Sequence, residues 1–584
     1  MRAGHPVVHD PQAARRAWIL GLAVASTLAW IPGGFTRFVF AKLLVLACAC
    51  LLASRLRREA SLPRALALTV AVGSVVLAVA ALAGPTPVAS LVGRWPRYEG
   101  LPVIGLYVAA AWLGARAVGA DGRHLAPLHR ALSVGSLVLF LVTVLETVGH
   151  SPLGPSNLDR PGSLLGNATD QAAVGLMMLA VLLAAVLRTP DRLLAAGALA
   201  ALGTVALSGS RAGIGVALVA IVVVTSVGAS RRRVAWGAAA AVVLAGTALA
   251  IPGTRDRLTG GRTLELRLVQ WRLSAEQAAD HLPLGLGPSG YEDGFGRYET
   301  REWIELAGAR DVPDSPHSWV LQAVSAGGVP LLLVALAVAA LVLVSGLRAA
   351  RRTPALLGLL VAVVGYGVML SINFTAAGPT CLAALLAGAL VATPAGNAPS
   401  WQRPAASALA VAAMVATGTA ALAEVELQRG VDAAARGDVA EASSAFDSAR
   451  ALRPYDGDVA MIAAQALAAP ASDGDLEAAS ATESAARRSL ARTPDTYASQ
   501  VALGVSLITQ QRLDEAVTVL DAAVADAPVR PSAYVQRAVA RFGLRDVAGA
   551  RADLLVALEL DPRDPSARRV LREIERRFPD GSAS

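Results

Sequence analysis

Two arginines and one histidine at the ends of apolar segments are the side chains of this chain best suited to chemistry. Arg160, Arg211 and His317 each lie in a polar connection next to a long apolar run. A guanidinium binds phosphate oxygens through two parallel hydrogen bonds, and a neutral imidazole accepts a proton near neutral pH. Together these groups are suited to binding an anion and to accepting a proton from, or orienting, a hydroxyl near the bilayer surface. Each also has a plainer interpretation: Arg211 as an interfacial arginine that reaches lipid phosphates, and His317 as a polar residue at a helix start.

The connection that contains Arg160 has the features of an anion-binding turn. Its sequence, LDRPGSLLGNATDQAAVG, places two glycines and Asn167 between Arg160 and Asp170, and it leads into an apolar helix. Backbone amides at the start of a helix, together with a nearby arginine, bind anions. Glycine and asparagine also form ordinary turns, so the segment gains specificity only from the other candidate residues.

A long connection at 252–316 is predicted to begin with a helix on the membrane surface. Apolar residues recur there at spacings of three and four, which places them on one face, at Leu264, Leu268, Trp271, Ala275, Ala278 and Leu282. Such a helix fits the interface between lipid and water. Arg267 and Arg272 lie on its other faces, and the turn-forming segment PLGLGPSGYEDGFGRY follows before His317.

The elements that must position these residues are membrane spans. Of the 584 residues, 54% are hydrophobic and 16% are charged, whereas soluble proteins have about 45–50% apolar and about 25% charged residues. The apolar runs are long enough for a helix to cross the hydrocarbon core of a bilayer. The sequence therefore predicts an all-α, polytopic membrane helix bundle of about 12–13 spans, at 17–35, 38–54, 64–84, 101–119, 128–148, 171–187, 192–208, 212–228, 234–251, 329–347, 355–372, 375–393 and 404–423.

Arginines predict how these spans cross the membrane. Arginine-rich connections face the cytoplasm by the positive-inside rule, and they alternate along the chain at Arg15–Arg16, Arg55–Arg64, Arg116–Arg130, Arg188–Arg192, Arg231–Arg233 and Arg348–Arg352. The N-terminal tail, residues 1–16, is then cytoplasmic. The segment 149–170, the turn 208–211 and the loop 252–316 share the extracytoplasmic face, so all the candidate residues lie on one side.

Other features argue against several classes of protein. The net charge is +8, but the arginines separate apolar runs and form no single basic face, which argues against nucleic acid as a partner. The three cysteines lie in apolar stretches without a CxxC motif, so neither a disulfide framework nor a zinc site is indicated. Two Asp-x-Asp triplets, at 456–458 and 473–475, fall where turns are expected. We therefore expect no metal and no cofactor.

The C-terminal part, residues 424–578, is predicted to be an α-solenoid of tetratricopeptide repeats, followed by a short tail at 579–584. Its segments share buried-type alanines and end at Pro454, Pro494, Pro528 and Pro562, and the last two intervals between these prolines are 34 residues, the period of these repeats. The alanines are Ala442, Ala478, Ala516 and Ala550. Such repeats form a concave surface for a partner. They lie outside the cytoplasm if the span 404–423 forms, and inside if it does not.

Taken in order, the motifs of the membrane part resemble the O-antigen ligase and O-antigen polymerase superfamily, some members of which carry tetratricopeptide repeats. The resemblance rests on R-x-G-x-x-x-G-N from Arg160 to Asn167, SGSRAG around Arg211, Arg267 with Trp271, PLGLGPSGY, and HSWVLQ followed by GGVP. It covers about 140–390 closely and 17–423 in layout. The family often has His-Asn where this chain has His317 and Ser318, and Pro-Asn near Ala168 and Thr169, so the acceptor remains open.

The resemblance implies a GT-C-like glycosyltransferase in the cytoplasmic (inner) membrane of a bacterial cell, with its active face outside. It would transfer a glycan from a polyprenyl diphosphate carrier to a hydroxyl on a glycan, lipid or protein acceptor, without a metal. Membrane lipid and a protein bound to the repeats are further expected partners. His317, Arg211 and Arg160 are the expected catalytic residues, and the expected substrate-binding residues are Arg267, Arg272, Asn167 and Asp170.

Two other functions are compatible with a chain of this size. A transporter or flippase of lipid-linked sugars would also have about a dozen spans, but it should show charges or broken helices at mid-membrane and symmetry between its halves. A membrane-anchored repeat scaffold would need far fewer spans. A measurement of polyprenyl diphosphate released from a lipid-linked glycan would distinguish the glycosyltransferase from the transporter and from the scaffold.

Overall fold

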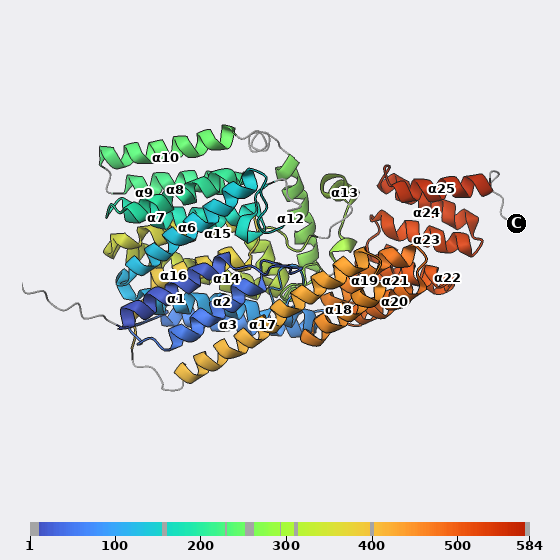
Figure 1. The fold of residues 1–584 in the computed structure, drawn as a ribbon, viewed down its shortest axis with the longest axis horizontal. Helices are drawn as coiled ribbons and strands as arrows, with labels where there is room; N and C mark the ends of the chain where they lie inside the picture. The colour runs from blue at the N-terminus through green and yellow to red at the C-terminus, as the bar shows by residue number, and fades with distance from the viewer. Residues whose placement is uncertain are drawn as a thin grey trace, which may run out of the picture.

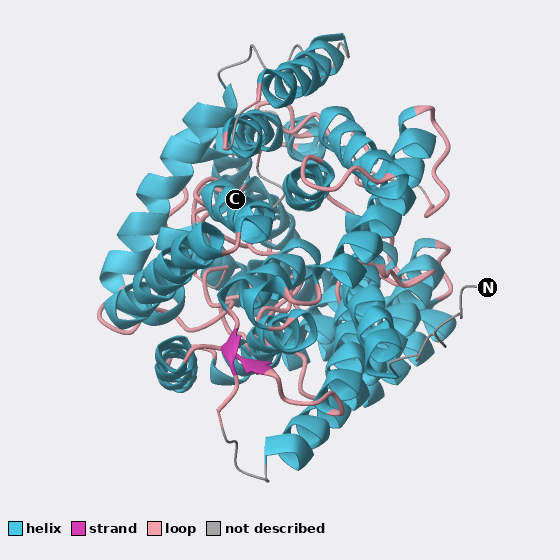
Figure 2. Ribbon diagram, turned by 90° about the vertical axis from the view of Figure 1, so that its left-hand side faces the viewer, coloured by secondary structure: helices cyan, strands magenta, loops and turns pink. Residues whose placement is uncertain are grey.

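The computed structural model describes residues 11–154, 160–227, 230–250, 262–292, 294–308, 313–396 and 402–578. Within these ranges the regular structure is helical, apart from one antiparallel pair of short strands, β1 (Ala60–Ser61) and β2 (Thr393–Pro394). Figure 1 shows two parts: a bundle of aligned helices, and a stack of helix pairs that extends from one end of it. Figure 2 views the opposite end of the bundle, where β1 and β2 lie. The all-α fold predicted from the sequence is confirmed.

Each span predicted from the sequence coincides with a helix, although the boundaries shift by several residues. The helices of the bundle are α1 (Pro11–Leu28), α2 (Phe40–Ser54), α3 (Arg64–Ala83), α5 (Leu101–Val118), α6 (Leu125–Thr147), α7 (Ala168–Val186), α8 (Arg192–Leu207), α9 (Arg211–Ser226), α10 (Arg231–Ala250), α14 (Trp319–Arg352), α15 (Leu357–Leu370), α16 (Ala377–Val391) and α17 (Gln402–Ala435). Seven of them are long and apolar enough to cross a membrane, namely α3, α5, α6, α7, α10, α14 and α17, and α2, α8, α9 and α16 are shorter apolar helices. The chain is therefore a multi-pass membrane protein.

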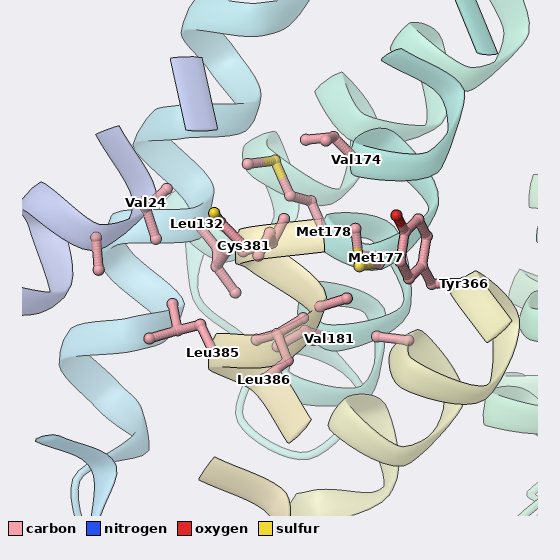
Figure 3. Close-up of a cluster of buried hydrophobic side chains, with 14 of the residues drawn as sticks. Val24, Leu132, Val174, Met177, Met178, Val181, Tyr366, Cys381, Leu385 and Leu386 are labelled. Atoms are coloured by element: carbon pink, nitrogen blue, oxygen red, sulfur yellow. The ribbon is translucent and has the colours of Figure 1, made fainter. Parts of the chain in front are cut away.

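Helix α7 forms the centre of the bundle. Its most apolar stretch is 83% buried, and it packs against α6, α8, α9, α15 and α16. Figure 3 shows Met177 and Met178 of α7 among side chains of neighbouring helices that include Leu132 and Leu385. This packing fixes the position of the first turn of α7, which carries Asp170.

Helix α14 is interrupted where the loop that precedes it packs against it; the described residues of this loop, 262–292, 294–308 and 313–316, are called the outer loop after its predicted location. Gly327 and Gly328 have non-helical backbone angles, and the φ angle of Gly328 is +63°, a conformation that favours glycine. A Cβ atom at Gly328 would overlap the carbonyl oxygen of Pro283, and the amide of Leu286 donates to the carbonyl of Ser325 at 2.7 Å. The PLGLG and GGVP motifs therefore form one close backbone contact, and this contact fixes the segment that leads into α14.

Helix α12 (Arg262–Asp280) lies across the ends of the bundle helices (Figure 1). The face that it packs against the protein carries Val269 and Leu273, which are buried, whereas Leu264 and Leu268 of the predicted apolar stripe are 63% and 55% exposed. An exposed apolar stripe is what a helix on the membrane surface presents to lipid, so that placement stays a prediction. Polar side chains such as Gln270 are buried on the protein-facing side and bond to the loop. The apolar partners of this face are Tyr291, Phe295, Trp303 and Ile304.

The C-terminal part is a stack of helix pairs, and the prediction of tetratricopeptide repeats is confirmed. The C-terminal half of α17 packs on α18 (Val439–Leu452), and the pairs that follow are α19 (Gly457–Ser472) with α20 (Leu476–Leu490), α21 (Tyr497–Thr509) with α22 (Leu513–Asp526), and α23 (Pro531–Gly543) with α24 (Val547–Leu560), before a last helix, α25 (Pro565–Arg577). The alanines used to find the repeats, Ala442, Ala478, Ala516 and Ala550, are completely buried. The expected boundary at 423/424 falls inside α17, which continues from the bundle into the repeats.

The repeats contact the outer loop directly. Arg530 forms a buried ion pair with Glu299 through two contacts of 2.7 Å. Arg297, in a short turn of the loop, pairs with Asp526 at 2.7 Å. The repeats and residues 294–308 of the loop therefore lie on the same side of the bundle.

Candidate functional site

His317 lies directly ahead of α14 in a strained backbone conformation. Its φ angle is +49°, in the left-handed region, which costs a residue other than glycine about 1–3 kcal/mol. The backbone is held on both sides: its amide donates to Ser315 Oγ at 3.4 Å, and its carbonyl accepts from Trp271 Nε1 at 3.4 Å. The ring packs edge-on against Phe374, with 4.9 Å between the ring centroids. These contacts give the imidazole one orientation.

The environment of the His317 ring favours its neutral form. Nδ1 is buried and has no hydrogen-bond partner within the part of the chain that the structure describes. Burial, followed by the charges of Arg267 and Arg97, lowers the pKa of His317 well below its ordinary value. At pH 7 the ring is therefore neutral and can accept a proton.

An arginine that the sequence analysis did not single out lies next to His317. Arg97 Nε is 3.0 Å from Asp314 Oδ2, and its guanidinium carbon is 5.1 Å from the centroid of Phe374, the ring that also contacts His317. Arg97 Nη1 lies 3.7 Å from Glu99 Oε2. Phe374 and the Asp314 segment thus join Arg97 to His317 in one cluster.

Glu99 is fixed in this cluster by two hydroxyl donors. It accepts hydrogen bonds from Tyr107 Oη at 2.7 Å and from Thr375 Oγ1 at 2.6 Å. Burial raises the pKa of Glu99, and Arg97 partly opposes this shift. The sequence held a signal for these residues, because the connection GRWPRYEG carries three charged side chains between two predicted spans. The positive-inside prediction assigns this connection to the same face as the other candidates.

The first turn of α7 holds two of the predicted substrate-binding residues. Asn167 is the N-cap residue of α7, and its Oδ1 accepts a hydrogen bond from the amide of Thr169 at 2.7 Å, which commits that oxygen to starting the helix. Asp170 is 5% exposed, and its Oδ1 has no hydrogen-bond partner among the described residues. It interacts electrostatically with Arg97 and Lys42. Arg97 therefore lies within electrostatic reach of both Asp170 and His317.

Lys42, the sole lysine of the chain, ties the turn ahead of α7 to the rest of the bundle. Its Nζ donates to the carbonyls of Thr27, Ala29 and Leu164, each at 2.8 Å. The side chain is 2% exposed, so the three bonds hold the ammonium group where no other solvation is at hand. Lys42 thereby positions the segment between Arg160 and Asn167, which the sequence analysis did not foresee.

Arg211 is the first residue of α9, beside the start of α7. The preceding residue, Ser210, is the N-cap, and its Oγ accepts from the amide of Gly213 at 3.3 Å. Gly213 contacts Ala172, two residues beyond Asp170. The structure thus places Arg211 near the first turn of α7. Arg160 lies in the turn that leads into the same helix, and both arginines are half-buried.

The two arginines predicted on α12 have different surroundings. Arg267 Nη1 donates to Gln270 Oε1 at 2.7 Å, and Gln270 Nε2 donates to the carbonyl of Ser315 at 2.7 Å. Burial lowers the pKa of Arg267 to about 10, and its charge faces His317. Arg272 is 52% exposed and pairs with Glu302 at 2.7 Å, so the structure does not bring it into the cluster.

The site therefore combines several fixed guanidinium groups with one neutral imidazole. Arg97 and Arg267 lie by His317, and Arg160 and Arg211 lie around the start of α7. Such groups stabilise the charge that develops on a phosphate leaving group. Within the described residues, no three side chains of the metal-binding types gather into a possible metal site.

Comparisons with known proteins agree with this description. A profile of the O-antigen ligase family matches residues 196–336, a range that contains Arg211, Arg267 and His317. Tetratricopeptide repeat profiles match 473–531 and 501–565. The resemblance stated from the motifs is thus confirmed. The matches support a membrane ligase or polymerase role.

Individual relatives give little information about the function of this chain. Curated proteins give no match. Among solved structures, a MamA D159K mutant is similar at 21% sequence identity, over 27% of this chain and 89% of that chain, with a TM-score of 0.22. That likeness is too low to inform the argument.

Proposed function

We propose that the chain is a glycosyltransferase that moves a glycan from a polyprenyl diphosphate carrier to a hydroxyl of an acceptor. The premise is the match to the O-antigen ligase family over 196–336. One observation supports this chemistry above the others: a neutral His317, with a buried Nδ1 that lacks a partner in the described chain, beside Arg97 and Arg267. A proton acceptor next to fixed cations suits attack of a hydroxyl on a carbon bonded to a diphosphate.

The reaction balances with the groups at hand. Arg160 and Arg211 bind the diphosphate of the donor, and His317 lies by the acceptor hydroxyl. The acceptor oxygen forms a bond to the anomeric carbon while the bond between that carbon and the phosphate oxygen breaks. The hydroxyl proton moves to His317 Nδ1, and polyprenyl diphosphate leaves with the bonding electron pair. A single displacement of this kind inverts the anomeric configuration.

Arg97 and Arg267 act on this step through His317. Their charges keep the imidazole neutral before the reaction, because a second positive charge beside them is unfavourable. For the same reason the imidazolium formed by the transfer loses its proton readily, which returns the site to its starting state. We assign both arginines as positioning residues. Asp170 offsets the charge of Arg97.

We further propose that arginine charges take the place that a metal ion holds in other glycosyl transfers. Guanidinium groups fixed in a site of low dielectric stabilise developing negative charge without reorganising. The proposed setting is the outer face of a bacterial cytoplasmic membrane, where the arginine-poor connections are expected. Arg272 has no part in this scheme, because it is paired with Glu302 on the exposed side of α12.

The test is release of polyprenyl diphosphate by the purified chain in nanodiscs that contain a polyprenyl diphosphate-linked oligosaccharide. We expect release that depends on an acceptor, that falls at least a hundredfold in Arg211→Ala, and that is unchanged in the matched control Arg272→Ala. Movement of an intact donor across liposomes without cleavage would instead establish a transporter. Absence of donor binding would leave only a scaffold.

A further inference from the structure

A groove of about 890 Å³ lies between the repeats and the outer loop. This volume is in the range of ligand-binding sites, about 300–1,000 Å³. Its floor is apolar and comes from the inner helices α19 and α21, with Met461, Ala468, Ala498, Val501 and Val505. Small side chains at several of these positions keep the groove open. Figure 1 shows α19 and α21 beside each other in the repeat stack.

The rim of the groove is acidic. Six carboxylates line it against two guanidiniums, and both arginines already have acidic partners: Arg94 pairs with Asp458 at 2.8 Å, and Arg530 pairs with Glu299 at 2.7 Å. Three of the carboxylates also have arginine partners, since Asp314 pairs with Arg97 at 3.0 Å and Arg297 pairs with Asp495 at 2.8 Å and with Asp526 at 2.7 Å, but the carboxylates still outnumber the guanidiniums. The carboxylates belong to Glu292, Asp314, Asp495, Asp526, Asp561 and Asp564. The resulting negative potential repels phosphate groups and attracts cationic ones. The groove therefore suits a ligand other than the diphosphate donor.

Its lining favours a polypeptide over a sugar chain. Sugars stack on open aromatic faces, but Trp95 packs near Phe35 at 6.1 Å between centroids, and Arg530 covers Tyr497 at 5.5 Å. An apolar floor accommodates aliphatic side chains rather than sugar hydroxyls.

The inner end of the groove reaches the candidate active site. Asp314 lines the groove, and its carboxylate contacts Arg97 Nε at 3.0 Å. Arg97 lies over Phe374 at 5.1 Å, and Phe374 packs against His317 at 4.9 Å. Pro96, which also lines the groove, directly precedes Arg97. A chain bound along α19 and α21 thus ends beside Asp314, which Arg97 and Phe374 connect to His317.

We propose that this groove binds the acceptor, and that the acceptor is an extended polypeptide segment with basic side chains and a serine or threonine hydroxyl. The inference rests on the proposed function, because it names the acceptor of that reaction. The repeats grip the segment on either side of the hydroxyl, and the Asp314 segment delivers the hydroxyl to His317. Specificity then comes from the repeats, while the membrane part supplies the donor.

The experiment measures peptide binding and donor binding separately, with the full-length chain in nanodiscs. The probes are two fluorescent degenerate peptide pools with a central serine, one with flanking arginine and lysine and one with flanking aspartate and glutamate, and a neutral oligosaccharide as competitor. Gln465 is an exposed residue of the groove on α19, and Gln465→Trp fills the groove without disturbing the core. Ala522→Trp, at an exposed position of α22 outside the groove, is the matched control.

We expect the basic pool to bind, and its affinity to fall at least tenfold in Gln465→Trp and in raised salt, with no change in Ala522→Trp. The acidic pool should bind at least tenfold more weakly than the basic pool. Donor binding should be the same in both variants. Equal binding of the two pools, or a groove variant that binds normally, would overturn the proposal. Displacement of the peptide by the oligosaccharide would make the acceptor a glycan. If the wild-type chain does not bind the donor, the proposed function itself is refuted.

Discussion

Neutralising Glu299 should detach the outer loop from the repeats. Glu299 and Arg530 form an ion pair whose side chains are 0% and 3% exposed, with two contacts of 2.7 Å. Glu299→Gln keeps the shape but leaves the charge of Arg530 buried without its partner. Breaking one side of a buried ion pair costs about 3–5 kcal/mol, which raises the open population roughly 150-fold to several thousandfold. The predicted result is a loop that exchanges far faster with solvent.

A second ion pair between the same two parts provides the control. Arg301 and Glu559 are also 2.7 Å apart, but their side chains are 57% and 59% exposed. Exposed pairs contribute little because water solvates the separated charges. Glu559→Gln should therefore leave the loop unchanged, although the bond length is the same. Burial, and not distance, separates the two predictions.

Hydrogen exchange of the full-length chain in nanodiscs measures this opening. The amides of 294–308 report on the loop, and those of α7 report on the bundle. We expect Glu299→Gln to accelerate exchange at 294–308 by two orders of magnitude or more, with no change in α7. Equal exchange in Glu299→Gln and Glu559→Gln would refute the reasoning, since it would show that the buried pair does not hold the loop.

Three further predictions follow from the site and the packing. Lys42→Met removes the donor to three buried carbonyls, and each carbonyl left without a hydrogen bond costs about 1–3 kcal/mol of stability. A thermal-shift assay should therefore show a clearly lower melting midpoint, and an unchanged midpoint would contradict the structural role given to Lys42. Ala516→Leu overpacks a completely buried repeat position at a cost of about 1–3 kcal/mol, whereas Ala522→Leu on the exposed face should be neutral in chemical unfolding of the repeats. The pKa of His317 is lowered, so the ring stays neutral as the pH falls through 6.5 and is protonated only well below it; single-turnover transfer should be flat from pH 8 to 6.5, and a half-loss near 6.5, the ordinary value, would mean that the ring is not held neutral.

The sequence predicted the helices of the membrane part well because the property that forms them is local. A long apolar run must satisfy its backbone within one helix, so composition alone locates α1 to α17 of the bundle. The repeats were equally predictable, since Ala442 and its counterparts recur at similar intervals and are buried as expected. The buried face of α12 could not be predicted in this way. Gln270 on that face bonds to the loop at Ser315, and the periodicity of apolar residues does not reveal such a contact.

Contacts between distant segments account for the rest of what the sequence missed. Arg97 joins the site through Asp314, 217 residues away, and no local pattern marks that pairing. Glu299 and Arg530 resemble ordinary surface charges in the sequence, yet they are buried against each other. Asp458, which the sequence assigned to a turn, also forms an ion pair with Arg94. The repeats thus help to position the segment that carries Arg97.

The measurement that tests the central claim most directly is donor affinity together with single-turnover transfer in His317→Ala. Polyprenyl diphosphate-linked oligosaccharide would be bound to the variant in nanodiscs, and transfer would start on addition of acceptor. Donor affinity should equal that of the wild type, because Arg160 and Arg211 remain, while transfer should fall at least a hundredfold, because no group accepts the hydroxyl proton. Near-normal transfer by a variant that binds donor would contradict the account and leave His317 as a residue that only starts α14.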